Sequence, residues 1–122
     1  MRMQENEYKQ IMNWIDEDRE EIISFLSRLV QCKTPSTIGD TREAVRLIAD
    51  FFDENHIGYE ELAFCKTMPN IISSFNGANV GRHLMLNGHL DVMPAGKEPG
   101  WTDDPWSVPS ATEGCGGAEL LT

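Results

Sequence analysis

Apolar residues recur at helical spacing in the N-terminal part of the chain. From about residue 5 to residue 31 they stand three or four positions apart with acidic residues between them, which predicts an amphipathic helix. Pro35 disfavours helical geometry at the preceding residue, so we expect this helix to end within residues 32–37. The apolar stripe is typical of a packing face, and it consists of Ile11, Trp14, Ile15, Ile22, Ile23, Phe25, Leu26, Leu29 and Val30.

A second helix is predicted after Gly39. Asp40 or Thr41 is suited to cap its N-terminus, and Gly58 is suited to end it in the left-handed conformation. His56, near the end of this helix, is interpreted as a surface residue or a helix-end cation. The predicted apolar face consists of Ala44, Leu47, Ile48, Phe51 and Phe52.

Three strands are predicted after these helices. Residues 59–64 and 70–75 read as strands, the second ending in a turn at Asn76 and Gly77. The apolar run of residues 84–86 reads as a third, short and buried strand that ends at Asn87 and Gly88. Helices followed by strands indicate part of an α/β layer, and 122 residues suffice for one small domain.

A histidine and an aspartate follow the third predicted strand. His89 and Asp91 are two positions apart, so in an extended chain their side chains would share one face. A carboxylate beside an imidazole selects its tautomer and leaves the other ring nitrogen free for a metal. An isolated pair of this kind is more often a turn histidine beside a surface aspartate.

Composition narrows the classes of partner. The chain has 10 Lys and Arg against 20 Asp and Glu, a net charge of -10, which disfavours nucleic acids and anionic membranes. Cys32, Cys65 and Cys115 show no metal-binding spacing and fit a reducing compartment. We find no secretory signal and no run of roughly twenty apolar residues. We therefore expect a soluble cytoplasmic protein.

Four segments together resemble the N-terminal part of a known enzyme family. They are LVQCKTPST, MPNIISSFNG, NGHLDVMPAG and GWTDDPWS, and the resemblance covers residues 22–107. The chain is similar to zinc-dependent amidohydrolases and exopeptidases, which include acetylornithine deacetylases, succinyl-diaminopimelate desuccinylases, aminoacylases, dipeptidases and glutamate carboxypeptidases. The resemblance implies an α/β fold, namely the N-terminal part of a three-layer α/β/α catalytic domain.

The same resemblance assigns roles to residues. His89 would be a ligand in a two-metal site, and Asp91 would orient it without touching the metal. Gly88 and Pro94 would shape the loop around this pair. The segment with Trp101, Asp104, Pro105 and Trp106 would be a packed turn that supplies no catalytic group.

The chemistry that the resemblance implies is hydrolysis of an amide bond. Two zinc ions, with cobalt or manganese as substitutes, would polarise the carbonyl and activate water, and a glutamate would act as general base. The substrate would be an N-acyl amino acid or a short peptide. The intact enzyme would form a homodimer through a domain that is absent here. The family takes its general base and its other metal ligands from later motifs that this sequence lacks.

The last fifteen residues do not match the family. We therefore divide the chain into residues 1–107, a portion of a metallohydrolase catalytic domain, and residues 108–122, a tail expected to lack native structure. Glu113 and Glu119 carry little weight as replacement ligands. With suitable choices of degenerate codons, restoring one base after Ser107 makes the tail read G-T-I-R-D-G-R-L-W-G-R-G-T-A-D-M. That reading contains the family's next motif, so we hypothesise a single-base deletion.

Three functions are compatible with these patterns. The first is a truncated metal-dependent amide hydrolase that is inactive by itself, because a catalytic zinc ion requires about three protein ligands. Zinc should then not bind tightly to this chain. The alternative is a non-catalytic α/β binding or oligomerisation module with a vestigial histidine. A third possibility, an enzyme that completes its site with ligands from a second chain, is the least favoured.

Overall fold

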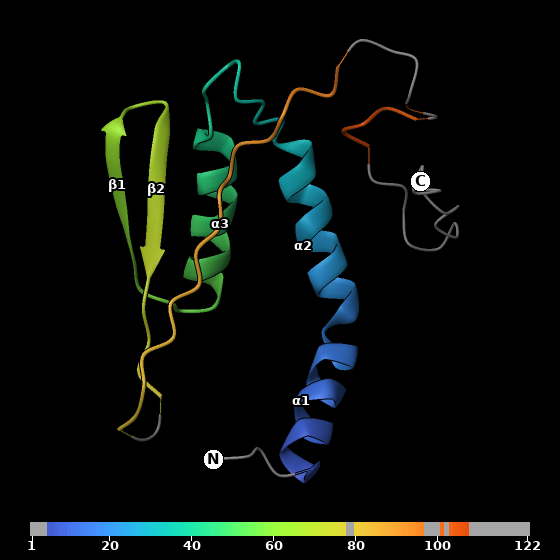
Figure 1. Cartoon of the computed structure of the whole chain (residues 1–122), viewed down its shortest axis with the longest axis vertical. Helices are drawn as coiled ribbons and strands as arrows, with labels where there is room; N and C mark the ends of the chain where they lie inside the picture. Colours follow the sequence, from blue (N-terminus) through green and yellow to red (C-terminus); the bar gives the residue numbers. More distant parts are fainter. Residues whose placement is uncertain (1–4, 78–79, 97–100, 102, 108–122) are drawn as a thin grey trace. The chain divides into compact units, whose positions relative to one another are not determined.

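The computed structural model of the chain describes residues 5–77, 80–96, 101 and 103–107. These residues fall into two units, one formed by residues 5–31, 106 and 107 and one running from Cys32 to Pro105 (Figure 1). Among the described residues, no helix is long and apolar enough to cross a membrane. The predicted tail, residues 108–122, lies outside the described residues, so the boundary at residue 107 stays a prediction.

The first unit contains two consecutive helices. α1 spans Glu5–Glu17 and α2 spans Arg19–Gln31, so the single helix expected over residues 5–31 is interrupted at Asp18. The amide of Asp18 still donates to the carbonyl of Trp14 at 2.9 Å, and the amide of Ile22 to that of Asp18 at 2.9 Å. Helical spacing therefore continues across the break. Neither helix has a fully buried residue.

The second unit is built on α3, which spans Arg42–Glu54 and packs against the strand β2, which spans Met68–Ser73. Its N-cap residue is Thr41, whose side chain makes no capping hydrogen bond. Asp40 takes that role, because its carboxylate accepts a hydrogen bond from the amide of Arg42 at 3.1 Å. The amide of Thr41 donates to the carbonyl of Thr67 at 2.8 Å, which fastens the start of α3 to the turn of the neighbouring hairpin.

The end of α3 differs from the prediction. The left-handed residue is His56, with φ of 57°, and not Gly58. The amide of His56 donates to Asp53 and that of Ile57 to Phe52, at 3.1 and 2.8 Å, which is the pattern of a Schellman cap. The expectation of a glycine at this position was wrong because His56 adopts the left-handed conformation two residues earlier.

A β-hairpin follows α3. β1 (Tyr59–Cys65) and β2 (Met68–Ser73) form an antiparallel two-stranded sheet. Both strands match predicted ones, although β2 begins and ends two residues before its predicted bounds. The pairs Leu62–Asn70 and Cys65–Met68 leave two residues of β1 opposite one residue of β2, which is a β-bulge.

The bulge explains why β2 begins earlier than expected. The residue of β2 opposite the two bulged residues is Pro69. Proline disfavours strands because it has no amide hydrogen to donate. Opposite a bulge the ladder is already interrupted, so the missing donor costs little. One of the two bulged residues, Phe64, is fully exposed.

The third predicted strand is not formed. Residues 80–91 belong to no strand, and among the described residues nothing pairs with residues 84–86. The side chains of Leu84, Met85 and Leu86 are 84%, 88% and 86% exposed. An apolar run becomes a buried strand only when neighbouring strands and a covering layer are present. The described fold is accordingly a mixed helix and strand α/β arrangement, and the three-layer architecture stays a proposal.

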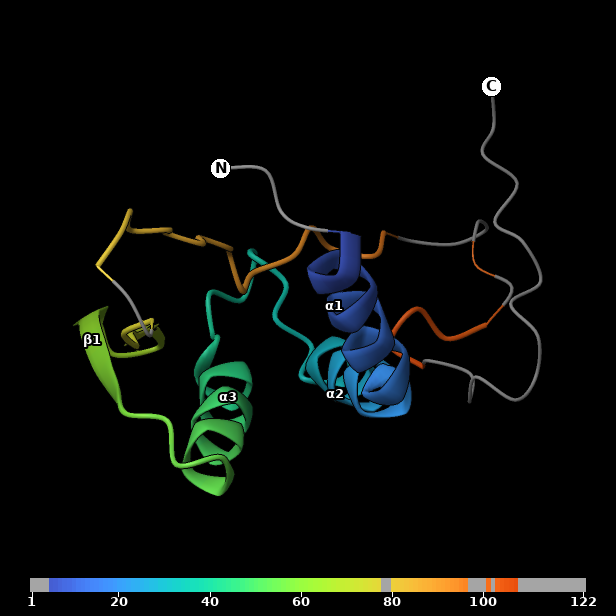
Figure 2. The ribbon, with the colours of Figure 1, turned by 90° about the horizontal axis from the view of Figure 1, so that it is seen from below.

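The core of the second unit is small. Its buried apolar residues include Cys32 and the α3 residues Ala44, Val45 and Ala49, and Val45 is its largest fully buried side chain. The chain returns from the hairpin toward residues 34–36, as Figures 1 and 2 show. This return brings the predicted histidine site beside the segment that follows α2.

Candidate functional site

The segment that carries His89 and Asp91 is held by residues 34–36. The hydroxyl of Thr34 donates to the carbonyl of Leu90 at 2.6 Å, and the amide of Val92 donates to the carbonyl of Thr34 at 2.9 Å. The amide of Ser36 donates to the carbonyl of Val92 at 2.9 Å. Pro35 and Val92 thereby form a parallel β-bridge. The two segments are far apart in the sequence, and sequence patterns gave no sign of their contact.

The structure brings His89 and Asp91 together. Nδ1 of His89 lies 2.6 Å from the main-chain carbonyl oxygen of Asp91 and 3.4 Å from Oδ1 of its carboxylate. Because a carbonyl oxygen only accepts hydrogen bonds, Nδ1 must be the donor. In the neutral imidazole Nε2 then keeps its lone pair. Asp91 therefore lies next to His89, as its spacing predicts, but the main-chain carbonyl of Asp91 is closer to Nδ1 than its carboxylate is.

Both side chains are accessible. Their exposed fractions are 82% for His89 and 51% for Asp91. Water screens the imidazole–carboxylate pair at such exposure, so the pair contributes little to folding stability. An exposed lone pair on Nε2 is nevertheless what a metal ligand requires.

A cavity of about 600 Å³ adjoins the histidine. One wall is the hairpin, including Leu62, Phe64 and Ile71, and another is residues 87–91. This volume lies within the usual range of small-molecule sites. His89 and Asp91 therefore contribute polar groups to the lining of a mostly apolar cavity.

The other residues that the resemblance singled out are less constrained. Gly88 does not have a positive φ, and a Cβ added there would meet no atom within 4 Å, so its position does not require glycine. The indole Nε1 of Trp101 donates to the carbonyl of Ala95 at 2.9 Å. This bond links the segment after the histidine to Trp101. Farther along the chain, Pro105 and Trp106 lie in a turn.

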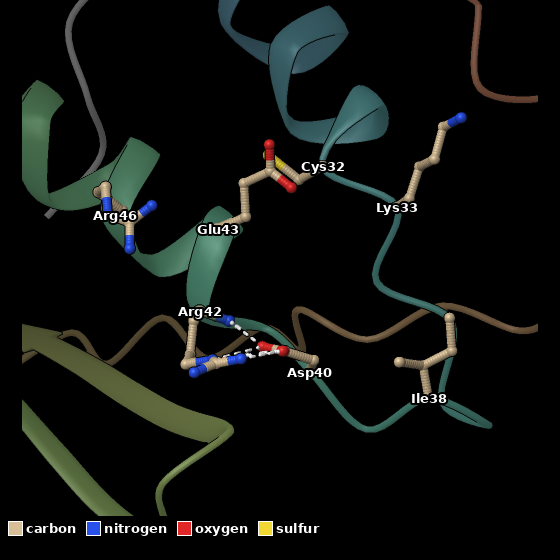
Figure 3. A pocket seen from close by; sticks show the side chains of 7 residues that line it. All are labelled: Cys32, Lys33, Ile38, Asp40, Arg42, Glu43 and Arg46. Carbon is tan, nitrogen blue, oxygen red and sulfur yellow. Dashed lines mark hydrogen bonds and ion pairs between the residues drawn. The ribbon is translucent and has the colours of Figure 1, made fainter.

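A second cavity, of about 460 Å³, lies at the start of α3 (Figure 3). Asp40 and Arg42 face one another there, with Nε of Arg42 2.9 Å from Oδ1 of Asp40. Hydrogen bonds from the side chain and amide of Arg42 lower the pKa of Asp40 to about 2, and Asp40 raises the pKa of Arg42. Arg42 is exposed and Asp40 is half-buried, and their hydrogen bonds lie at the start of α3.

The two cysteines that the structure describes do not add a site. Cys32 is buried and Cys65 exposed, and neither forms a disulfide, while Cys115 lies outside the described residues. A hydrogen bond with Thr67 lowers the pKa of the Cys65 thiol, which is 3.3 Å from the Thr67 hydroxyl. The described residues contain no group of three His, Cys, Asp or Glu placed to hold a metal ion. Among the described residues, His89 is therefore not part of a complete set of metal ligands.

Comparisons with known proteins agree with a hydrolase. The chain is 24% identical over 95 residues to N-formyl-4-amino-5-aminomethyl-2-methylpyrimidine deformylase of Bacillus subtilis, covering 75% of this chain and 22% of the relative. It is 25% identical over 107 residues to the Cys-Gly metallodipeptidase dug1 of Schizosaccharomyces pombe, covering 77% of this chain and 22% of the relative. The same deformylase from Halalkalibacterium halodurans is 24% identical over 103 residues, covering 82% and 24%.

These relatives are much longer than the part of them that the chain matches. The chain spans 22% to 24% of the length of the curated relatives. No family model and no solved structure matches it. The names support a hydrolase, and the name of the dipeptidase supports a metal cofactor. The identity of the metal and the particular family members expected above stay predictions, because these names do not specify them.

Proposed function

We propose that this chain is part of a metal-dependent hydrolase of amide bonds, in which Nε2 of His89 binds the metal. The observation that carries the proposal is the hydrogen bond from Nδ1 of His89 to the carbonyl of Asp91, at 2.6 Å. Metal-binding histidines usually donate their second ring nitrogen to a carbonyl or carboxylate in this way. The names of the distant relatives support the same reaction class.

The proposed metal is zinc, at a site for two ions in the intact enzyme, with cobalt or manganese as substitutes. A bound divalent metal polarises the scissile carbonyl and lowers the pKa of water. In this proposal His89 binds the metal and Asp91 orients the imidazole ring of His89. Asp91 does so through its main-chain carbonyl and through its carboxylate, which is 3.4 Å from Nδ1.

The same proposal covers the substrate and the setting of the intact enzyme. The substrate is an N-acyl amino acid or a short peptide, and the enzyme is a cytoplasmic homodimer. Since one described histidine cannot replace the roughly three protein ligands of a catalytic zinc, the chain by itself is expected to bind zinc weakly and to be inactive. The family resemblance implies that the other ligands and the general base come from later motifs that this sequence lacks.

Zinc titration of the full chain tests the assignment. Zinc binding is followed by calorimetry and by the ¹⁵N shifts of the histidine rings, with His89→Ala as the test variant. His83→Ala is the matched control, because His83 is an exposed histidine six positions earlier. We expect weak binding that moves the Nε2 signal of His89, is lost in His89→Ala and is kept in His83→Ala. Binding that survives His89→Ala unchanged, or that acts through Nδ1, would contradict the assignment.

A further inference from the structure

We propose that Thr34 is a positioning residue for His89, which acts by holding the peptide on both sides of Asp91. This inference rests on the proposed function, because it concerns the nitrogen that His89 offers to a metal. Thr34 touches neither His89 nor a substrate in this role. It acts through the main-chain carbonyl to which Nδ1 of His89 donates.

The contacts of Thr34 enclose Asp91 from both neighbours. Its hydroxyl donates to the carbonyl of Leu90, the residue before Asp91, at 2.6 Å. Its carbonyl accepts from the amide of Val92, the residue after Asp91, at 2.9 Å. With both flanking peptides fixed, the orientation of the Asp91 carbonyl is fixed as well. That carbonyl is the one 2.6 Å from Nδ1 of His89.

The two hydrogen bonds of Thr34 to residues 90 and 92, together called the Thr34 clamp, are strengthened by the burial of Thr34. Thr34 is 5% exposed, whereas His89 and Asp91 are both accessible. Leu90 is partly buried, so water competes less for the hydrogen bond from the Thr34 hydroxyl than for those of the exposed pair. Removal of that hydroxyl would leave the Leu90 carbonyl without its partner in the described structure.

The local sequence favours the extended backbone that Thr34 needs in order to make both hydrogen bonds to residues 90–92. The residue before a proline prefers extended backbone, so Pro35 favours an extended Thr34 that can pair as a short strand with residues 90–92. Lys33, with φ of 49°, turns the chain from α2 into this extended stretch. The carbonyl and hydroxyl of Thr34 consequently meet the same partner segment.

The chemical effect is selection of the histidine tautomer. A neutral imidazole carries its proton on either Nδ1 or Nε2, and only the Nδ1–H form donates to the Asp91 carbonyl and presents a lone pair at Nε2. If the competent form is less populated, the apparent affinity for a metal falls by the same fraction. Thr34 thus sets the fraction of His89 that is in the Nδ1–H tautomer and can bind a metal through Nε2.

The test uses the full chain and two variants of nearly the same size. Thr34→Val keeps the shape and removes the hydroxyl, and Thr34→Ser keeps the hydroxyl and removes the methyl group. Long-range ¹H–¹⁵N spectra, recorded where the imidazoles are neutral, give the tautomer of each histidine, and far-UV circular dichroism reports folding. His83, six positions before His89 in the chain, is the internal control.

We expect the Nδ1–H tautomer of His89 to predominate in the wild-type chain and in Thr34→Ser. Thr34→Val should lose that excess, and because equal tautomer populations halve the competent form, its zinc affinity should fall about 2-fold. The tautomer of His83 should be the same in all three proteins. A purely structural role for Thr34 would change folding without a tautomer change confined to His89.

Three results would overturn the inference: a wild-type His89 protonated mainly on Nε2, a folded Thr34→Val with the wild-type tautomer, or no rescue by serine. The first needs no variant, so the inference stays testable if Thr34→Val fails to fold. A tautomer that depends on Thr34, in a chain whose zinc binding ignores His89, would support the clamp and reject the proposed function. The two failures are therefore distinguishable.

Discussion

Replacement of Val45 by alanine probes the core that supports the site. Val45 is 2% exposed and is the largest fully buried side chain among the described residues. Val45→Ala deletes two methyl groups, which lowers the free energy of unfolding by roughly 1.6 kcal/mol from lost burial alone. The cavity left behind brings the expected total to about 2 kcal/mol.

Thermal unfolding followed by far-UV circular dichroism measures this change. For a domain of this size, 2 kcal/mol corresponds to a fall in Tm of roughly 8–16 °C. Val80→Ala is the matched control, because it deletes the same atoms at a side chain that is 108% exposed; its expected effect is within about 0.5 kcal/mol. Equal Tm values for the two variants would refute the assignment of Val45 to the core.

Two further predictions concern the start of α3 and the histidine loop. Gly39→Ala should lower the free energy of unfolding by about 1 kcal/mol, because Gly39 has φ of +64°. Gly88→Ala should leave the free energy of unfolding unchanged, and urea denaturation compares the two variants. A larger loss of stability in Gly88→Ala than in Gly39→Ala would contradict the backbone conformation described. The pKa of Asp40 is lowered to about 2 by hydrogen bonds from Arg42, so its stabilising effect should be complete above the ordinary carboxyl pKa of about 4 and disappear as the pH falls through 2. Urea midpoints measured across that range should therefore fall more steeply in the wild-type chain than in Asp40→Asn, and parallel curves would show that the pair does not stabilise the fold.

Regular elements with local signals were predictable from the sequence. The periodic apolar face of α3 and the strand-forming residues of the hairpin depend on neighbours only a few positions away, and both elements formed near their expected positions. The cap of α3 was assigned to the wrong residue because rules based on residue type favour Gly58. The backbone instead turns at His56.

The third strand was predicted wrongly because burial is not a local property. The apolar run from Leu84 to Leu86 indicates a strand only if other segments cover it, and the described residues provide no such cover. Its exposed side chains are an apolar surface of the kind that promotes association.

The site was predictable in part. The spacing of His89 and Asp91 placed them together, but the shorter contact uses a main-chain carbonyl, which no residue type reveals. The contribution of Thr34 was missed for a different reason. It depends on a contact between segments separated by 56 positions, and a single sequence offers no pattern at that range.

The parallel bridge between Pro35 and Val92 has a consequence for the order of folding. Closing the loop between Thr34 and Leu90, which lie beside this bridge and are 56 positions apart, costs roughly 3.5 kcal/mol of chain entropy in the unfolded state, whereas α3 and the hairpin close over short distances. The bridge therefore forms late, after these local elements have shortened the effective loop, and it opens early when the unit is destabilised. The geometry at His89 consequently depends on a contact between segments far apart in the sequence, so conditions that leave α3 and the hairpin intact can still separate residues 90–92 from residues 34–36.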